Sequence, residues 1–261
     1  MSIPSDLAIK DRPAPPLAEY KSHEIQGFCV RTDPALREAE LETVLSLVKS
    51  DLGKIAQVIP PPALDVIRTV PIVITRRTAH RPGVGDRGAC FHPSCAWLVD
   101  HGYDCERAGV VEVLSCDDYA AWRSIQPAML LHELAHAFHW LLGFDRADVR
   151  EAYQEASAGR SLYAAVAHVD GRTRERAYAL TNHHEYFAEL TEAFYWTNDF
   201  YPFTREELRP YDKPGADLVE KLWTLDAQSL AAEIARVNAR EPAVNTEGRR
   251  LSNPAAAEPS K

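Results

Sequence analysis

Long apolar runs are missing from this chain of 261 residues, because polar side chains interrupt every hydrophobic stretch well before the roughly 20 apolar residues that span a bilayer. The first 16 residues, MSIPSDLAIKDRPAPP, also lack the apolar core of a secretory signal. Positive charge is not in excess, since 29 basic side chains face 38 acidic ones and the formal net charge is −9. Without a stripe of Lys and Arg, we expect no binding to nucleic acid or to a membrane surface.

Cysteine is scarce, odd in number and free of CxxC pairs; the five are Cys29, Cys90, Cys95, Cys105 and Cys116. For a chain without an export signal, free thiols and a reducing compartment are the default. We therefore expect free thiols and a cytoplasmic location. Cys90, His92 and Cys95 could supply three ligands of a second metal ion, but no fourth ligand is evident, and a strand that carries small thiols is the interpretation we favour.

Both ends of the chain are poor in residues that could enter a core. Residues 1–20 contain four prolines, and residues 241–261 are rich in Pro, Ala and charged side chains. We expect flexible arms at both ends, because they have too little apolar surface to offset the entropy of ordering. The body between them, residues 21–240, has the size of a single domain.

The hydrophobic pattern of this body changes near residue 116. Before it, alternating or β-branched runs predict four strands, at 23–32, 71–77, 90–99 and 110–116. One helix is expected between the first two strands, from about 33 to 58, and Pro93 favours an edge strand or a bulge. After residue 116 the pattern is mainly helical, except that Asp170-Gly171 predicts a hairpin within 162–180. The predicted fold class is α+β, with a small mixed sheet followed by a mainly helical half.

Residues 127–143, PAMLLHELAHAFHWLLG, predict one helix of about four turns. His132 and His136 are four residues apart in it, so their imidazoles lie on one face, close enough to bind one ion. Glu133 follows the first histidine around the helix and can reach a water molecule on that ion. This is the HExxH arrangement of zinc hydrolases.

The rest of this helix is apolar, so burial of its polar groups without partners would cost several kcal/mol. A metal ion removes that cost, because neutral imidazoles become its ligands. His139 shares the face with His132 but lies two turns further along. We expect it to be packed or to support the site rather than to bind the ion.

A zinc site of this kind needs a third protein ligand and leaves a fourth position for water. Residues 181–196, TNHHEYFAELTEAFYW, predict a second helix with three glutamates on one face, Glu185, Glu189 and Glu192. Glu185 is favoured as the ligand, because a helix N-terminus stabilises an ionised carboxylate by roughly 0.3–1 kcal/mol. Glu189, one turn on, is placed to orient a ligating histidine through its free ring N–H.

Two alternatives for this segment remain open. Glu185 could instead close a capping box with Asn182 at the start of the helix. His183 and His184 are rival third ligands.

The segment YALTNHHEYFAE, from Tyr178 to Glu189, resembles the one that follows HExxH in gluzincin-type zinc peptidases, specifically the catalytic domain of anthrax lethal factor and the Pro-Pro endopeptidases. In that pattern a tyrosine stands seven residues before the glutamate ligand, and an aromatic pair, an alanine and a second glutamate follow it. The gap from His136 to Glu185 (185 − 136 = 49) is also similar. The resemblance implies that Glu185 is the third ligand and that the Tyr178 hydroxyl stabilises the reacting oxyanion. The whole chain looks more like uncharacterised metallopeptidases of bacteria and fungi, which implies a common fold and no known substrate.

These observations predict a zinc-dependent metallopeptidase with one catalytic Zn²⁺. Such an ion lowers the pKa of a bound water molecule from about 15.7 toward 7. Glu133 would take the proton of that water and pass it to the leaving amine, while Tyr178 donates to the oxyanion. The expected partner is a peptide or a small-molecule amide substrate. Two other functions remain open, a zinc hydrolase of a non-peptide amide or other small molecule in a biosynthetic pathway, and a noncatalytic zinc-binding interaction protein. An exposed strand beside an extended groove, within residues 88–99, favours the peptidase, and a closed pocket favours a small molecule.

Overall fold

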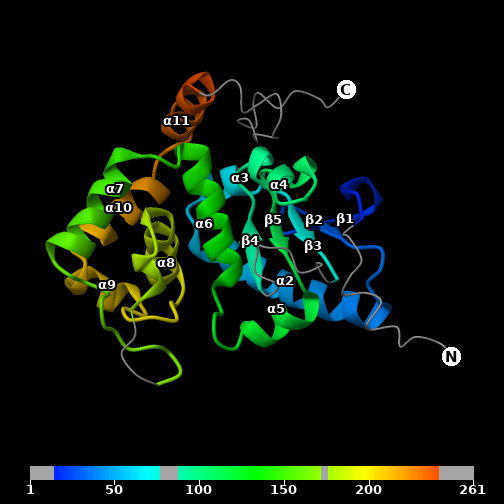
Figure 1. The fold of residues 1–261 in the computed structure, drawn as a ribbon, viewed down its shortest axis with the longest axis horizontal. Helices are drawn as coiled ribbons and strands as arrows, with labels where there is room; N and C mark the ends of the chain where they lie inside the picture. Colours follow the sequence, from blue (N-terminus) through cyan, green and yellow to red (C-terminus); the bar gives the residue numbers. More distant parts are fainter. Residues whose placement is uncertain (1–14, 77–87, 172–175, 241–261) are drawn as a thin grey trace.

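The computed structural model describes residues 15–76, 88–171 and 176–240. Five strands form one sheet in the order β1-β2-β3-β5-β4 (Figure 1). Their bounds are Lys21–Ile25 for β1, Phe28–Thr32 for β2, Ile72–Ile74 for β3, Ala89–Phe91 for β4 and Val111–Val113 for β5. The pairs β2–β3 and β3–β5 are parallel, whereas β1–β2 and β5–β4 are antiparallel. The sheet is therefore small and mixed, as predicted.

Helices cover this sheet and make up most of the second half of the chain (Figure 1). Their bounds are Glu38–Val58 for α2, Pro61–Ile67 for α3, Cys95–Asp100 for α4, Cys116–Trp122 for α5, Met129–Leu142 for α6, Ala147–Gln154 for α7, His183–Tyr195 for α8, Arg205–Tyr211 for α9, Lys213–Trp223 for α10 and Ala227–Arg240 for α11. The α+β prediction is confirmed. Among the described residues, no helix combines the length and the hydropathy needed to cross a membrane.

The segment predicted as one strand, residues 23–32, is instead a hairpin. Ile25 of β1 lies opposite Phe28 of β2, and the two residues between them, Gln26 and Gly27, have φ of 54° and 82°. Two-residue hairpin turns of this kind need positive φ at both positions, which glycine adopts at no steric cost. The prediction was wrong because it included the Gln26-Gly27 turn in the strand, although the apolar positions change phase there, from Ile25 to Phe28 and Val30.

The predicted strand at 90–99 is also shorter than expected. Strand β4 ends at Phe91, and α4 begins at Cys95, where the Ser94 side chain accepts a hydrogen bond from the Trp97 N–H at 3.2 Å. A serine in this position satisfies one of the free N–H groups of the first helical turn. The expectation of an edge strand is confirmed, since β4 is the last strand of the sheet.

The hairpin expected within 162–180 is not formed by the part of this segment that the structure describes. His168 makes an isolated antiparallel bridge with Phe200, far along the chain, and Tyr178–Leu180 forms a short 3-10 helix, η4. Residues 172–175 lie outside the described residues. The apolar run around His168 therefore pairs with the segment after α8 rather than with its own neighbour.

One pair of cysteines forms a disulfide, so the prediction of free thiols throughout is wrong. Cys95 at the start of α4 is bonded to Cys105, and their Cα atoms lie 4.6 Å apart. The reversal of the chain after α4 brings them together, which spacing along the sequence does not reveal. Cys95 is thus not available to a metal site with Cys90 and His92, and the thiol argument for a reducing compartment is weakened. The cytoplasmic location stays a prediction.

The predicted N-terminal arm extends less far into the chain than expected, because residues 15–20 pack against the fold. Leu17 and Tyr20 are buried, and the Arg107 guanidinium donates to the Pro15 carbonyl and to the Tyr20 hydroxyl, both at 3.2 Å. Arg107 also pairs with Glu112, in the middle of β5. Residues 1–14 and 241–261, the rest of the two predicted arms, lie outside the described residues.

Glu112 is the centre of this buried network. It accepts a hydrogen bond from His92, which follows β4, with 2.9 Å between Nε2 and Oε2. Burial opposes ionisation, but the His92 hydrogen bond and the Arg107 charge outweigh it and lower the pKa of Glu112 to about 2. The ionised carboxylate therefore connects β5, the end of β4 and the N-terminal segment.

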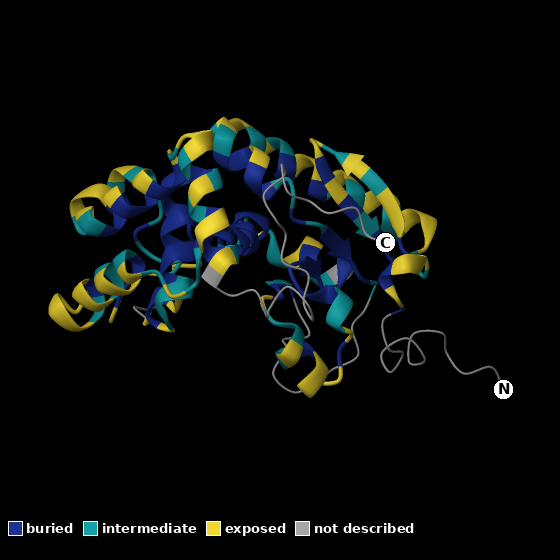
Figure 2. Cartoon of the chain, turned by 90° about the horizontal axis from the view of Figure 1, so that it is seen from above, coloured by how far each residue is buried: buried dark blue, intermediate teal, exposed yellow. Residues whose placement is uncertain are grey.

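The core continues from the sheet into the helical half through α6. Thirteen of its 14 residues are buried, all but His136, so this helix has no solvent-facing side. Phe138 of α6 stacks on Trp223 of α10, with ring centroids 4.1 Å apart. Figure 2 shows the buried residues in the interior and the exposed ones along the outer faces of the surrounding helices.

Candidate metal centre

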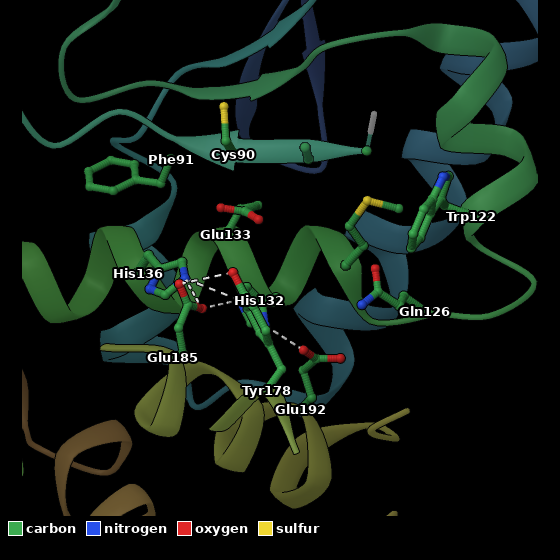
Figure 3. Close-up of a pocket in the computed structure, with 13 residues that line it drawn as sticks. Cys90, Phe91, Trp122, Gln126, His132, Glu133, His136, Tyr178, Glu185 and Glu192 are labelled. Atoms are coloured by element: carbon green, nitrogen blue, oxygen red, sulfur yellow. Dashed lines mark hydrogen bonds and ion pairs between the residues drawn. The ribbon is translucent and has the colours of Figure 1, made fainter. Parts of the chain in front are cut away.

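Helix α6 lies between β4 and α8, so its polar residues face one or the other (Figure 1). His132 and His136 are directed toward α8, and Glu133 is directed toward β4 (Figure 3). The arrangement follows from helical periodicity, since residues four apart share a face and the next residue is turned by about 100°. One helix thus presents two imidazoles to one neighbour and a carboxylate to the other.

The start of α8 brings Glu185 to these histidines. Asn182 caps the helix, and its side chain accepts hydrogen bonds from the N–H groups of His184 and Glu185 at 2.8 and 3.0 Å. Glu185 therefore sits in the first turn, as the sequence predicts. Its carboxylate contacts His132 and His136, so the capping box that was an alternative for this residue is not what the side chain makes.

Three atoms converge on one point between α6 and α8. Oε2 of Glu185 lies 3.0 Å from Nε2 of His132 and 3.0 Å from Nε2 of His136, and the two nitrogens are 3.1 Å apart. In a triangle of this size a point about 1 Å out of the plane is about 2 Å from all three atoms, which matches Zn–N and Zn–O bonds of roughly 2.0–2.2 Å. The residues present therefore fit a tetrahedral ion whose fourth position faces out of the triangle.

The protonation states of the site follow from its contacts. Burial disfavours a charged imidazole, but hydrogen bonds to Glu185 and Glu192 outweigh it and raise the pKa of His132. Burial would also keep Glu185 neutral, yet hydrogen bonds from His132 and His136 lower the pKa of its carboxyl well below the ordinary value. In the absence of an ion, a proton on His132 balances the ionised glutamate, and a cation can take the place of that proton.

Glu192, not Glu189, orients the first histidine. The Nδ1–H of His132 donates to Oε1 of Glu192 at 2.5 Å, whereas the nearest Glu189 oxygen is 3.8 Å away. This contact fixes the tautomer of His132 that has its lone pair on Nε2, as a metal ligand requires. The prediction for Glu189 was wrong by one helical turn, because α8 crosses α6 so that its third glutamate faces His132.

Glu133 and Tyr178 lie beside the three converging atoms, on the wall of a cavity of about 360 Å³ (Figure 3). Tyr178 is 47% exposed, and its hydroxyl donates to Oε1 of Glu185 at 3.4 Å. Burial and the nearby Glu185 charge raise the pKa of Tyr178 to about 12, so that it keeps its proton at neutral pH. Both residues that the sequence assigns to catalysis thus share one cavity with the three assigned to the metal.

Two further walls of the cavity come from β4, which lies within the candidate strand region 88–99, and from the segment before α6, which sequence reasoning did not predict. Residues 88–91, which include β4, lie along one side, and Figure 3 shows Trp122 and Gln126 at one end. Met129 also lines the cavity, and its sulfur would lie 3.2 Å from a Cβ placed on Gly88. The segment that contains Trp122 and Gln126 immediately precedes the HExxH helix, which was the one available clue that it lines the site.

The remaining histidines of the two helices do not join the converging group. The Nε2 atom of His183 lies 3.1 Å from the Phe144 carbonyl, and the rings of His139 and His184 pack on Phe144 with centroids 5.3 and 4.1 Å away. His139 is 1% exposed, and neither of its ring nitrogens has a partner among the described residues. His139 is therefore packed, as expected. Of the residues at the start of α8, it is Glu185 whose side chain contacts His132 and His136.

Among the described residues, two groups of side chains bring possible ligand atoms within 4.8 Å of one another, His132 with His136 and Glu185, and His132 with Glu189 and Glu192. A comparison of the chain with known protein families, with curated proteins and with solved structures found no match.

Proposed function

We propose that this protein is a zinc-dependent metallopeptidase of the gluzincin type. The observation that carries the proposal is the convergence of two imidazole nitrogens and one carboxylate oxygen, 3.0–3.1 Å apart, on the wall of a cavity. Two nitrogens and one oxygen with an open fourth position suit zinc better than the harder ions, which prefer oxygen alone. His132, His136 and Glu185 would hold the ion, and its chemistry there would be that of a Lewis acid, which polarises a carbonyl and activates water.

The other residues of the cavity supply the proton transfers. Glu133 follows the first ligand on α6 and faces the open side of the site, where it can take a proton from an attacking water and return it to the leaving amine. Tyr178 keeps its proton at neutral pH and can donate it in a hydrogen bond to the oxyanion of a tetrahedral intermediate. Glu192 holds the His132 ring in place throughout.

The position of β4 supports a peptide as the substrate. This strand ends the sheet, so its outer edge has no strand partner among the described residues, and the same residues line the cavity. An extended peptide can add to such an edge through main-chain hydrogen bonds, which places its carbonyl groups beside α6. The cavity volume also lies in the range of pockets for small ligands, and this favours a non-peptide amide as the second candidate.

Elemental analysis of the purified protein beside H136A and E185A tests the ligand set. We expect about one zinc per chain in the wild type and a loss in both variants, since three protein ligands are needed. If E185A retains its zinc, the third ligand is not Glu185 and must be another residue. A wild type without zinc, whose thermal stability does not change when zinc is added, would refute the metal site and the proposed function with it.

The reaction is tested separately with the zinc-loaded enzyme, a peptide library and a set of simple amides. E133Q is the matched control, because it keeps the shape of the side chain and all three ligands but removes the base. Cleavage of peptides by the wild type and not by E133Q supports the peptidase. Cleavage of small amides alone selects the second candidate, and equal cleavage by E133Q contradicts the mechanism.

A further inference from the structure

Gln126 lies on the cavity wall, in the segment that leads into α6, and the proposed chemistry gives it no role. Its main chain is held on both sides. The N–H of Gln126 donates to the Trp122 carbonyl at 2.7 Å, and its carbonyl accepts a hydrogen bond from the Met129 N–H at 3.2 Å. The backbone between α5 and α6 therefore places this side chain at a defined point beside the cavity.

A buried carboxylate fixes the orientation of the Gln126 amide. Nε2 of Gln126 donates to Oδ2 of Asp199 at 3.0 Å, and Asp199 is 3% exposed. Carboxylate oxygens accept hydrogen bonds and do not donate them, so the amide atom that faces Asp199 is the nitrogen. Asp199 is itself held by its main chain, since its carbonyl accepts from the Val169 N–H at 2.7 Å, next to the bridge between His168 and Phe200.

The same contact leaves the amide oxygen of Gln126 to the cavity. Figure 3 shows this oxygen directed toward the side of the cavity that β4 forms, whereas the nitrogen is directed away from it. Among the described residues Oε1 of Gln126 has no hydrogen-bond partner, yet it is not shut off from solvent as Oε1 of Glu189 and Oδ1 of Asp199 are. The cavity therefore holds one acceptor whose direction the protein has set and which is free for a group that enters.

On the other side of the cavity, β4 offers main-chain groups at regular intervals. Gly88 accepts a hydrogen bond from the residue after β5 at 3.1 Å, and His92 donates one to the residue before β5 at 3.0 Å. In an antiparallel pair the residues between such positions face the other way, so Ala89 and Phe91 direct their N–H and C=O groups to the open edge. A peptide that pairs with this edge turns every second residue toward β4 and the residues between toward the opposite wall, where Gln126 lies (Figure 3).

We propose that Gln126 is a specificity-determining residue, whose amide oxygen accepts a hydrogen bond from one main-chain N–H of a bound peptide. This inference rests on the proposed function and narrows its substrate class. The peptide must carry an N–H at that position, so proline, which has none, is disfavoured there. The position lies away from the bond that is cleaved, since Figure 3 shows Gln126 at the end of the cavity opposite His136 and Glu185.

Trialanine hydroxamates test the proposal on the full-length, zinc-loaded chain, because a hydroxamate binds zinc and no cleavage is needed. One probe carries the hydroxamate at its C-terminus and the other at its N-terminus, so that the peptide extends from the ion in both directions along the cavity. Each N–H of the two peptides is methylated in turn, and acetohydroxamate serves as the probe without a peptide. Q126L removes the acceptor and keeps a side chain of similar size, and Q57L is the matched control at an exposed position of α2.

We expect methylation at one position to weaken binding to the wild type and to Q57L by about three- to tenfold more than binding to Q126L, the range of one neutral hydrogen bond. Methylation at the other positions should affect the three proteins alike, and acetohydroxamate should bind all three equally.

Zinc content is measured in the same samples, which separates the possible failures. Equal methylation profiles for the wild type and Q126L, in proteins that contain zinc, overturn this inference and leave the proposed function standing. Binding of acetohydroxamate but of neither peptide probe overturns it as well. A wild type without zinc, or with zinc that acetohydroxamate does not reach, refutes the proposed function, and the inference fails with it.

Discussion

The hydrogen bond between His132 and Glu192 leads to a prediction with a clear control in the same helix. Replacement of Glu192 by Gln keeps an acceptor of the same shape but removes its charge. Hydrogen bonds to charged groups contribute about 1.5–3 kcal/mol and neutral ones about 0.5–1.5, so the difference is roughly 1–1.5 kcal/mol. By the free-energy scale of binding this is about a tenfold loss of zinc affinity, at the lower end of what such outer contacts to a ligating histidine contribute.

Glu189 serves as the control, because its nearest oxygen is 3.8 Å from the same nitrogen, too far for a hydrogen bond. We expect E189Q to change zinc affinity by less than about threefold, since only a longer-range charge effect remains. The assay is competition between each apoprotein and a chromophoric zinc chelator in calcium-free buffer at neutral pH. A weaker zinc affinity in E189Q than in E192Q would refute the assignment of Glu192 and restore the sequence-based choice.

Four further predictions concern catalysis, zinc retention and stability. Y178F should keep its zinc and lose about 10²–10³-fold in turnover of a cleaved substrate, because one oxyanion donor is removed. Zinc content and turnover are measured on the same samples, and a fall in both would contradict this role. Because the pKa of His132 is raised, zinc must displace a proton below that pKa, so zinc retained after dialysis should fall as the pH is lowered from 8 to 5. Burial and the nearby His183 lower the pKa of His184 to about 4, and burial and the nearby His184 lower the pKa of His139. Both rings are therefore neutral in the folded protein, and their contribution to the free energy of unfolding is complete above about pH 6.5 and is lost as the pH falls toward 4. H139F removes two buried nitrogens that have no partner among the described residues, so it should raise the free energy of unfolding by about 1–2 kcal/mol at pH 7 and weaken its dependence on pH. Denaturant unfolding at several pH values measures both effects. A lower free energy of unfolding with an unchanged pH dependence would count against this prediction.

Local periodicity explains why the candidate ligands were predictable. His132 and His136 belong to one helix, so their common face follows from helix geometry alone. Glu185 follows from the position of Asn182, since a capping side chain fixes which residues form the first turn. These inferences need no knowledge of how distant segments pack.

The errors arose where distant segments meet. The choice between Glu189 and Glu192 depends on how α8 crosses α6, which neither helix specifies by itself. The Cys95–Cys105 disulfide depends on the chain reversal after α4, and the contribution of Trp122 and Gln126 to the cavity depends on how the segment before α6 packs. In each case the outcome is decided by tertiary packing, whose energy is spread over many buried residues.

The contacts of Arg107 have a practical consequence for the design of protein fragments. A fragment that begins at residue 21, where the predicted arm ends, would lose the Tyr20 hydroxyl and the Pro15 carbonyl that this buried guanidinium contacts. Arg107 in turn pairs with Glu112, which accepts a hydrogen bond from His92 just beyond the cavity strand β4. We therefore expect the shortest soluble fragment with an intact cavity to begin at or before Pro15, and a screen of truncated forms should show an abrupt loss of soluble yield between residues 15 and 21.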